Sequence, residues 1–114
     1  MAVEHKLLII CSEVAAGTTD AETYTPSSSV TSLEITSFVG EAAFSPNSVV
    51  KLVWKWDHAT ETEVLIWSTK GSSQKDLSYE ITDCDGVRKL AVVLENGEDG
   101  SIVMSGECEF REHT

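Results

Sequence analysis

The sequence predicts an all-β protein, an antiparallel two-sheet β-sandwich of about seven strands. Apolar and polar side chains alternate with a period of two along several short segments, as is typical of strands with one buried face. Clusters of Gly, Asp, Asn and Ser separate these segments, and no segment combines a helical period with capping residues. A small closed β-barrel is the alternative, because alternation does not show how the strands close. At 114 residues, the chain is expected to form one domain, residues 1–114.

The N-terminal third is predicted to contain two strands and a long loop. Residues 5–16 form the first strand, and residues 7–10 are apolar on both faces, which predicts a strand that is covered on both sides. Residues 17–29 are rich in Ser, Thr, Gly and Asp and are predicted to be a loop, which Tyr24 could fix to the domain. Residues 30–39 form the second strand.

The centre of the chain, residues 48–71, is predicted to be a β-hairpin that follows a turn at residues 40–48. Polar residues 57–62 connect its two strands. The second of these strands, residues 63–67, is apolar on both faces and is expected to be covered in part on both sides. The hairpin carries all three tryptophans of the chain. The alternation assigns to the core face of its first strand Val50, Leu52, Trp54 and Trp56.

The C-terminal part is predicted to contain three further strands. Gly106 in the last of them marks either a β-bulge or a close approach of the backbone. The predicted segments are a polar link at 72–76, strands at 77–82, 88–95 and 101–111, and turns at 83–86 and 96–100.

The charge balance narrows the possible partners. The chain has 8 Lys and Arg residues against 19 Asp and Glu residues, which gives a net charge of −11. Such a surface repels nucleic acid and anionic membranes, and the sequence has no cluster of basic residues that would offset the net negative charge. The sequence therefore predicts no nucleic-acid and no membrane partner, and it is compatible with a basic partner or with mimicry of nucleic acid.

Three cysteines, Cys11, Cys84 and Cys108, form neither a disulfide framework nor a zinc-binding pattern. The N-terminus has no basic segment before a long apolar run, so no signal peptide is expected. Both observations favour a reducing cytoplasm with free thiols, and a disulfide between two of the three cysteines is the alternative. Cys11 and Cys108 are expected to be small core residues.

Catalysis is not expected. The histidines, His5, His58 and His113, lie near the two ends and in a hairpin turn, where nothing in the sequence holds one of them beside a nucleophile. The sequence contains no GxSxG, P-loop, GxGxxG or HExxH motif. We therefore expect no enzyme activity and no cofactor.

A metal site at Asp83 and Asp85 is the weaker of two interpretations of the acidic turns. Calcium prefers several carboxylate and carbonyl oxygens, and further acidic residues lie in the turn at the other end of strand 88–95. That strand would hold the two turns roughly 20 Å apart, at about 3.3 Å per residue, so they cannot share one ion. The favoured interpretation is that Asp and Asn occur in turns because they tolerate left-handed backbone.

The tryptophans also admit two interpretations. As core or interface anchors they would bury large areas, with each indole N–H bonded to one acceptor. As exposed rings they would form a platform on which a sugar or another protein stacks. The candidate binding residues in this second interpretation are Trp56, Trp67 and Tyr24.

Three segments carry a resemblance to known proteins: SVVKLVWKWDHATETEVLIW, TTDAETYTPSSSVTS and LAVVLENGEDGSIVMSGECEF. With them the chain resembles small β-sandwich accessory proteins of tailed-phage virions, including head-decoration, adaptor and tail-associated proteins. The resemblance implies a symmetric, many-copy assembly without catalytic residues, located in the virion and assembled in the host cytoplasm. It assigns no site residue. Immunoglobulin-like domains share the broad pattern, but a convincing cysteine pair around a tryptophan is missing.

Two functions therefore stand as expectations. The first is a structural protein of a phage particle, which contacts other virion proteins and copies of itself through strand edges, the N-terminal segment and the loop at residues 17–29. The alternative is a carbohydrate-binding or other ligand-binding module that uses Trp67 and Trp56.

Overall fold

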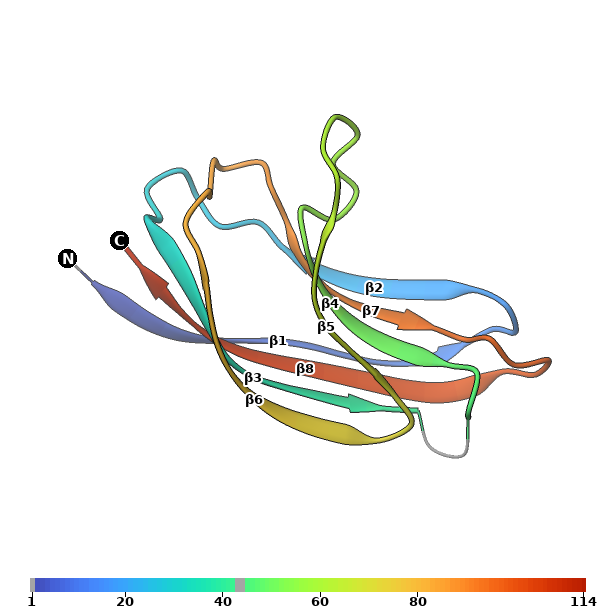
Figure 1. Ribbon diagram of the computed structural model, residues 1–114. Helices are drawn as coiled ribbons and strands as arrows, with labels where there is room; N and C mark the ends of the chain where they lie inside the picture. The colour runs from blue at the N-terminus through green and yellow to red at the C-terminus, as the bar shows by residue number, and fades with distance from the viewer. Residues whose placement is uncertain (1, 43–44) are drawn as a thin grey trace.

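The computed structural model describes residues 2–42 and 45–114, and within them every regular element is a β-strand. Eight strands form two antiparallel sheets of four, which pack face to face (Figure 1). The predicted β-sandwich is therefore confirmed, and the described sheets do not close into the alternative barrel. The predicted turn at residues 40–48 includes Ala43 and Phe44, which lie outside the described residues. The strands are β1 (Val3–Val14), β2 (Thr19–Tyr24), β3 (Ser32–Glu41), β4 (Val49–Trp54), β5 (Val64–Lys70), β6 (Ser73–Ile81), β7 (Leu90–Glu95) and β8 (Ile102–His113).

The strand order is β1-β8-β3-β6 in one sheet and β2-β7-β4-β5 in the other. The pairs β1–β8, β2–β7, β3–β6 and β4–β5 are all antiparallel, so the first half of the chain pairs with the second half in reverse order. A long hairpin that is rolled up in this way is a jelly roll. The two ends of the chain lie close together (Figure 1), and the Thr114 N–H donates to the Ala2 carbonyl at 3.0 Å.

The core lies between the inner faces of the sheets. Gly40 and Gly106 lie opposite each other on β3 and β8, and a Cβ atom on either would come within 2.9 Å of a Val50 carbon in the facing sheet. The two glycines thus let the sheets approach closely. Of the two expectations for Gly106, a β-bulge or a close approach of the backbone, the structure has the close approach. The main buried side chains of this core are Leu8, Ile10, Val14, Leu33, Ile35, Phe38, Val50, Leu52, Trp54, Leu90, Val92, Leu94, Met104, Cys108 and Phe110.

Strand β2 lies within residues 17–29, and the prediction of a loop there is wrong. Its sequence, TDAETY, contains no apolar alternation, and most of its residues are exposed. β7 is buried, so the backbone N–H and C=O groups of β7 need hydrogen-bond partners on the side away from β4. β2 forms because it supplies those partners. Strand β6 likewise begins at Ser73, inside the predicted link at 72–76, because it pairs with β3. The fold therefore has one strand more than the sequence predicts.

Two segments that are predicted to be covered on both faces are covered on one. β1 is an edge strand, and its outer-face residues Leu7 and Ile9 are 58% and 57% exposed, whereas Leu8 and Ile10 are buried. β5 is an edge strand of the other sheet, and Leu65 on it is 56% exposed. Apolar side chains on both faces of these strands thus reflect an exposed outer face and not a covering layer.

Trp54 and Trp56 fall on opposite faces of their sheet, although alternation assigns both to the core. β4 ends at Trp54, which is buried. Lys55 and Asp57 adopt left-handed backbone, with φ of 64° and 56°. This irregular backbone places the Trp56 ring on the outer face, where it packs in a second apolar cluster with Val53. The core assignment of Trp56 is therefore wrong.

The close sheet contact at Gly106 predicts that Gly106→Ala destabilises the fold. A Cβ atom there would lie 2.4 Å from Val92 Cγ1, so the sheets would have to move apart. We expect a loss of about 1–3 kcal/mol in the free energy of unfolding, measured by urea denaturation. Gly100→Ala is the matched control, because no atom lies within 4 Å of its added Cβ. Equal stability of the two variants would contradict the close contact.

Candidate functional site

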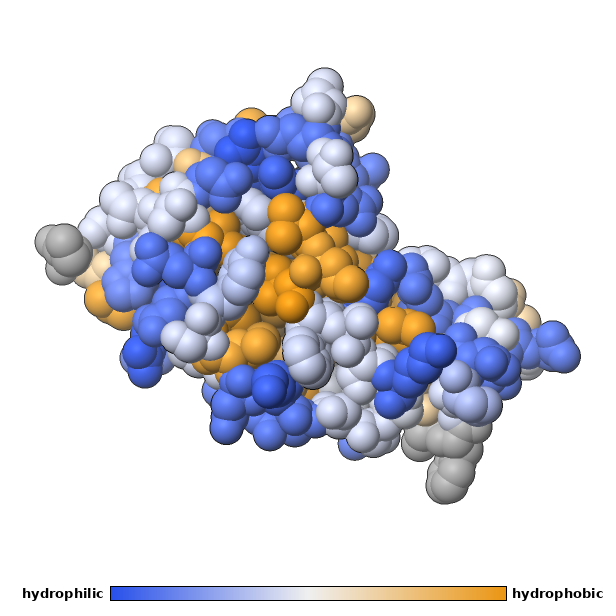
Figure 2. Space-filling view, viewed as in Figure 1, coloured by the Kyte–Doolittle hydropathy of each residue, from blue (hydrophilic) through white to orange (hydrophobic). Residues whose placement is uncertain are grey.

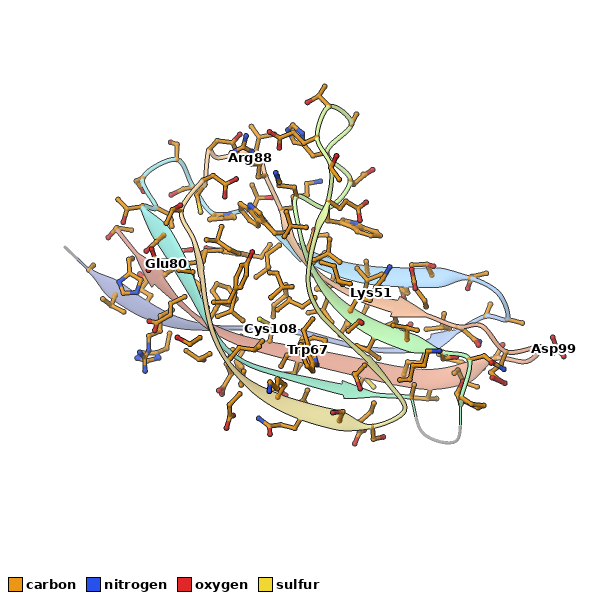
Figure 3. The ribbon with its side chains drawn as sticks, in the orientation of Figure 1. Lys51, Trp67, Glu80, Arg88, Asp99 and Cys108 are labelled. Atoms are coloured by element: carbon orange, nitrogen blue, oxygen red, sulfur yellow. The ribbon has the colours of Figure 1, made fainter. Side chains whose placement is uncertain are left out.

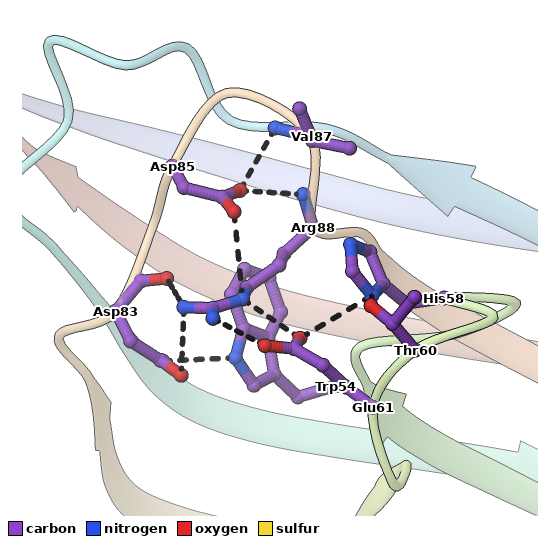
Figure 4. Close-up of polar contacts among 8 residues, drawn as sticks. All are labelled: Trp54, His58, Thr60, Glu61, Asp83, Asp85, Val87 and Arg88. Atoms are coloured by element: carbon purple, nitrogen blue, oxygen red, sulfur yellow. Dashed lines mark hydrogen bonds and ion pairs between the residues drawn. The ribbon is translucent and has the colours of Figure 1, made fainter.

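Arg88 joins two loops at one end of the sandwich (Figure 4). Its Nε donates to Glu61 Oε2 at 2.9 Å, its Nη2 donates to Glu61 Oε1, and its Nη1 donates to the Asp83 carbonyl at 2.7 Å. Glu61 belongs to the β4–β5 loop, whereas Asp83 and Arg88 belong to the β6–β7 loop. The bidentate guanidinium–carboxylate pair therefore fixes the two loops to each other.

The candidate metal residues Asp83 and Asp85 take part in this same cluster. Asp83 Oδ1 accepts from Trp54 Nε1 at 2.9 Å. Asp85 Oδ1 accepts from the backbone N–H groups of Val87 and Arg88 at 2.9 and 2.8 Å, which forms a turn. Within residues 2–42 and 45–114, no group of three or more His, Cys, Asp or Glu side chains is arranged to hold a metal ion. Asp85 thus forms a turn through its side chain, but neither Asp83 nor Asp85 adopts the left-handed backbone on which the favoured interpretation rests.

His58 lies near a hydroxyl and a carboxylate without the geometry of a catalytic triad. Its Nδ1 is 3.3 Å from Thr60 Oγ1 and 3.5 Å from Glu61 Oε2. A triad needs its nucleophile and its carboxylate on opposite ring nitrogens, whereas both contacts here use one nitrogen. Glu61 is also held by Arg88. The arrangement therefore offers no route for proton transfer from Thr60 through the ring.

Tyr24 joins the end of β2 to the end of β8. Its hydroxyl donates to Glu112 Oε2, and its ring centre lies 5.5 Å from that of Phe110. Lys6 Nζ lies 5.4 Å from the centre of the Tyr24 ring. Burial and the Glu112 carboxylate raise the pKa of Tyr24 above its ordinary value. The candidate binding residue Tyr24 is thus a tie between the two sheets, with its hydroxyl already bonded.

The other two candidate binding residues, Trp56 and Trp67, lie on opposite faces of the β2-β7-β4-β5 sheet. Trp67 packs against the core between the sheets (Figure 3) and lies opposite Leu52 in the strand pairing. Lys75 Nζ is 5.3 Å from its ring centre. Trp56 packs on the outer face. Both rings are half-buried, and they do not form one continuous platform.

The three cysteines are free thiols in three different environments. Cys108 lies in the core as predicted, and burial raises its pKa to about 12. Burial also raises the pKa of Cys84 to about 11. Both thiols are therefore protonated at neutral pH and are poor nucleophiles. Cys11 is exposed on the outer face of β1, so the prediction that it lies in the core is wrong.

Exposed apolar side chains on the outer face of β1 and β8, which alternate with Glu107 and Glu109 across the strand pair, are the feature that the sequence analysis missed. Leu7, Ile9 and Val103 on the outer face of this sheet are 58%, 57% and 66% exposed. Two hollows of about 540 and 410 Å³ lie along the same face and are lined by residues of β1, β3 and β8. We call these three side chains, together with the free edge of β1, the β1 face. A signal for it was present, because Leu7, Ile9 and Cys11 share one side of the first predicted strand.

The Arg88–Glu61 pair predicts a pH-dependent stability. The hydrogen bonds from Arg88 lower the pKa of Glu61, so the pair stabilises the fold fully above the ordinary carboxyl pKa of 4.5 and less as the pH falls through the lowered value. We expect Glu61→Gln to lower the melting temperature by a few degrees at neutral pH and by less in acid, as followed by circular dichroism.

Glu34→Gln is the matched control for that measurement. It removes an ion pair of 3.3 Å with Arg111 whose side chains are 34% and 44% exposed, against 23% for both Glu61 and Arg88. Because a more exposed pair is more strongly screened by water, its loss should lower the melting temperature less. An unchanged melting temperature of Glu61→Gln at every pH would contradict the role of Arg88 in joining the loops.

Within the described residues, no helix has the length and apolar character needed to cross a bilayer. A scan of the chain against protein-family models finds no matching family, and a search of curated proteins finds no match.

Proposed function

We propose that this chain is a non-enzymatic structural protein of a virus particle, of the tailed-phage kind, which acts through protein–protein contacts in a symmetric assembly. The observation that carries the proposal is the β1 face, where aliphatic side chains are exposed beside a strand edge with unpaired backbone groups. Surfaces and edges of this kind invite pairing with another protein. The partners would be other virion proteins and copies of the same chain.

The jelly-roll arrangement supports this proposal without deciding it. Eight-stranded jelly rolls build viral capsid domains, but they also build lectins and cupins. The fold is therefore compatible with a structural role or a binding role. The structural role is favoured because polar groups at one end of the sandwich bond to each other, as in the Arg88–Glu61 pair, whereas exposed apolar side chains lie on a sheet face.

Purified particles test the proposal. Virions from the source of this sequence should contain the chain at a fixed copy number relative to the major capsid protein, measured by quantitative mass spectrometry of density-gradient fractions. In a background that lacks the gene, a supplied chain should be incorporated, and Leu7→Glu should reduce incorporation because it places a charge on the β1 face.

Leu65→Glu is the control for Leu7→Glu, because Leu65 is 56% exposed, nearly as much as Leu7 at 58%, but lies on β5 in the other sheet. This control variant should be incorporated normally. A chain that is found only in the soluble lysate, and never with particles, would contradict the structural role.

A ligand-binding module is the second candidate, and one feature favours it. Figure 2 shows an apolar patch between β6 and β5, the edge strands on that side of the two sheets. Partly buried apolar residues of these strands, Ile66, Trp67 and Leu77, pack against the core from there. The Trp67 ring is half-buried there, so part of its surface is available for a ligand beside Lys75.

Tryptophan fluorescence with a panel of glycans tests this second candidate. If a glycan binds beside β5, the emission should change in the unaltered chain and in Trp56→Phe, and the change should be lost in Trp67→Phe. Emission that no glycan alters would count against the binding module.

A further inference from the structure

β1 differs from the other edge strands in having no charged side chain along its middle. Each sheet ends in two edge strands, β1 and β6 in one and β2 and β5 in the other. β6 and β2 carry charged side chains along their length, and β5 is seven residues long and pairs with β4 through an irregular register. β1 is twelve residues long, and its residues 7–12, LLIICS, contain no charge. Charges, short length and bulges are the usual protections of a free edge.

We propose that β1 pairs antiparallel with β1 of a second copy of this chain. The twofold axis of this pair would pass between the Ile9 residues of the two copies. The four-stranded sheet of each copy would then continue into that of the other. The inference rests on the proposed structural role and deepens it, because it names a copy of the chain as the partner of the β1 face. Strand pairing of this kind joins backbone groups that are otherwise free.

The register follows from the side chains that would face each other. When the axis passes through Ile9, residues equally distant from Ile9 on either side lie opposite each other and on the same face. Ile9 then packs against Ile9 of the second copy, and Leu7 lies opposite Cys11 of the second copy. His5 lies opposite Glu13 of the second copy, so apolar side chains meet at the centre and polar pairs flank them.

Neighbouring registers are less complementary. An axis through Leu8 would place Glu13 opposite Val3, and an axis through Ile10 would place Glu13 opposite Leu7. Each of these two registers also sets Lys6 against an apolar side chain, Ile10 or Val14, and so contains two kinds of charged–apolar contact. The axis at Ile9 contains one, Glu4 opposite Val14 near the strand ends. A charge set against an apolar side chain loses solvation without gaining a partner. Registers shifted by one residue, in which two adjacent residues such as Leu8 and Ile9 lie opposite each other, would place inner-face residues opposite outer-face residues. The charges and apolar side chains of β1 thus favour the axis through Ile9.

The balance of forces predicts how the dimer responds to salt. The two edges would form about ten backbone hydrogen bonds, as many as an ordinary protein interface. The opposing force is the net charge of −11 on each copy. Since salt screens charge repulsion beyond about 8 Å at physiological ionic strength and leaves apolar and backbone pairing in place, added salt should strengthen the dimer.

Size-exclusion chromatography with light scattering tests the pairing on the full chain over a range of concentrations and salt. We expect a dimer whose Kd falls as salt rises. Ile9→Lys places two ammonium groups opposite each other at the axis and should raise Kd by about a hundredfold or more. Leu65→Lys, at a residue 56% exposed against 57% for Ile9, should leave the dimer intact. A monomer under all conditions, or a dimer that survives Ile9→Lys, overturns the proposal.

A cysteine at the axis tests the register. In a Cys11→Ser background, Ile9→Cys should form an intermolecular disulfide under mild oxidation, because opposite Cα atoms in an antiparallel pair lie about 4.5–5.5 Å apart, within the Cα separation of a disulfide. Val87→Cys in the same background is the control, because Val87 is 60% exposed on the β6–β7 loop and should not cross-link. A dimeric sample in which Ile9→Cys does not cross-link overturns the axis.

The two proposals fail separately. A chain that is monomeric in solution and is nevertheless present at a fixed copy number in virions overturns the edge pairing and leaves the structural role intact. A dimer of this geometry that is absent from virions overturns the structural role.

Discussion

The contact of Val50 with two glycines sets the distance between the sheets, and most of the fold depends on it. Gly40 and Gly106 are opposite neighbours on β3 and β8, and neither has room for a Cβ atom beside Val50. Because the sheets approach closely there, the side chains between them are almost fully buried. The Cα positions span 47 × 30 × 18 Å, which makes the domain a thin slab. Such a slab offers a partner its end loops, its outer faces and its strand edges.

Polar contacts within the domain hold together one end of this slab, where Tyr24 pairs with Leu90 and Leu90 pairs with Trp54. Arg88 holds the β4–β5 loop to the β6–β7 loop, and the indole of Trp54 adds a bond to the same cluster. Tyr24 bonds to Glu112 where β2 meets the end of β8. The polar groups of these side chains are thus already bonded within the domain. On the outer face of β1, Leu7 and Ile9 are exposed, and this face with its strand edge is the surface that we propose for another protein.

Alternation along single strands was enough to predict the fold class, the β4–β5 hairpin and the core position of Trp54. It failed where a distant segment decides the outcome. β2 has no apolar pattern of its own and is a strand because β7 pairs with it. The exposure of Leu7 and Ile9 follows from the place of β1 at a sheet edge, which depends on strand order. The Arg88–Glu61 pair joins residues 27 positions apart, and no local pattern marks it.

Hydrogen exchange along β1 tests most directly whether this edge is the docking surface. In a single copy, the outward N–H groups of β1 and of β6 both face solvent, because both strands are edges of the same sheet. Pairing through β1 predicts that exchange in β1 slows as the concentration of the chain rises, while exchange in β6 stays unchanged. Fast exchange in β1 at every concentration, or slowing in β6 alone, would contradict the assignment.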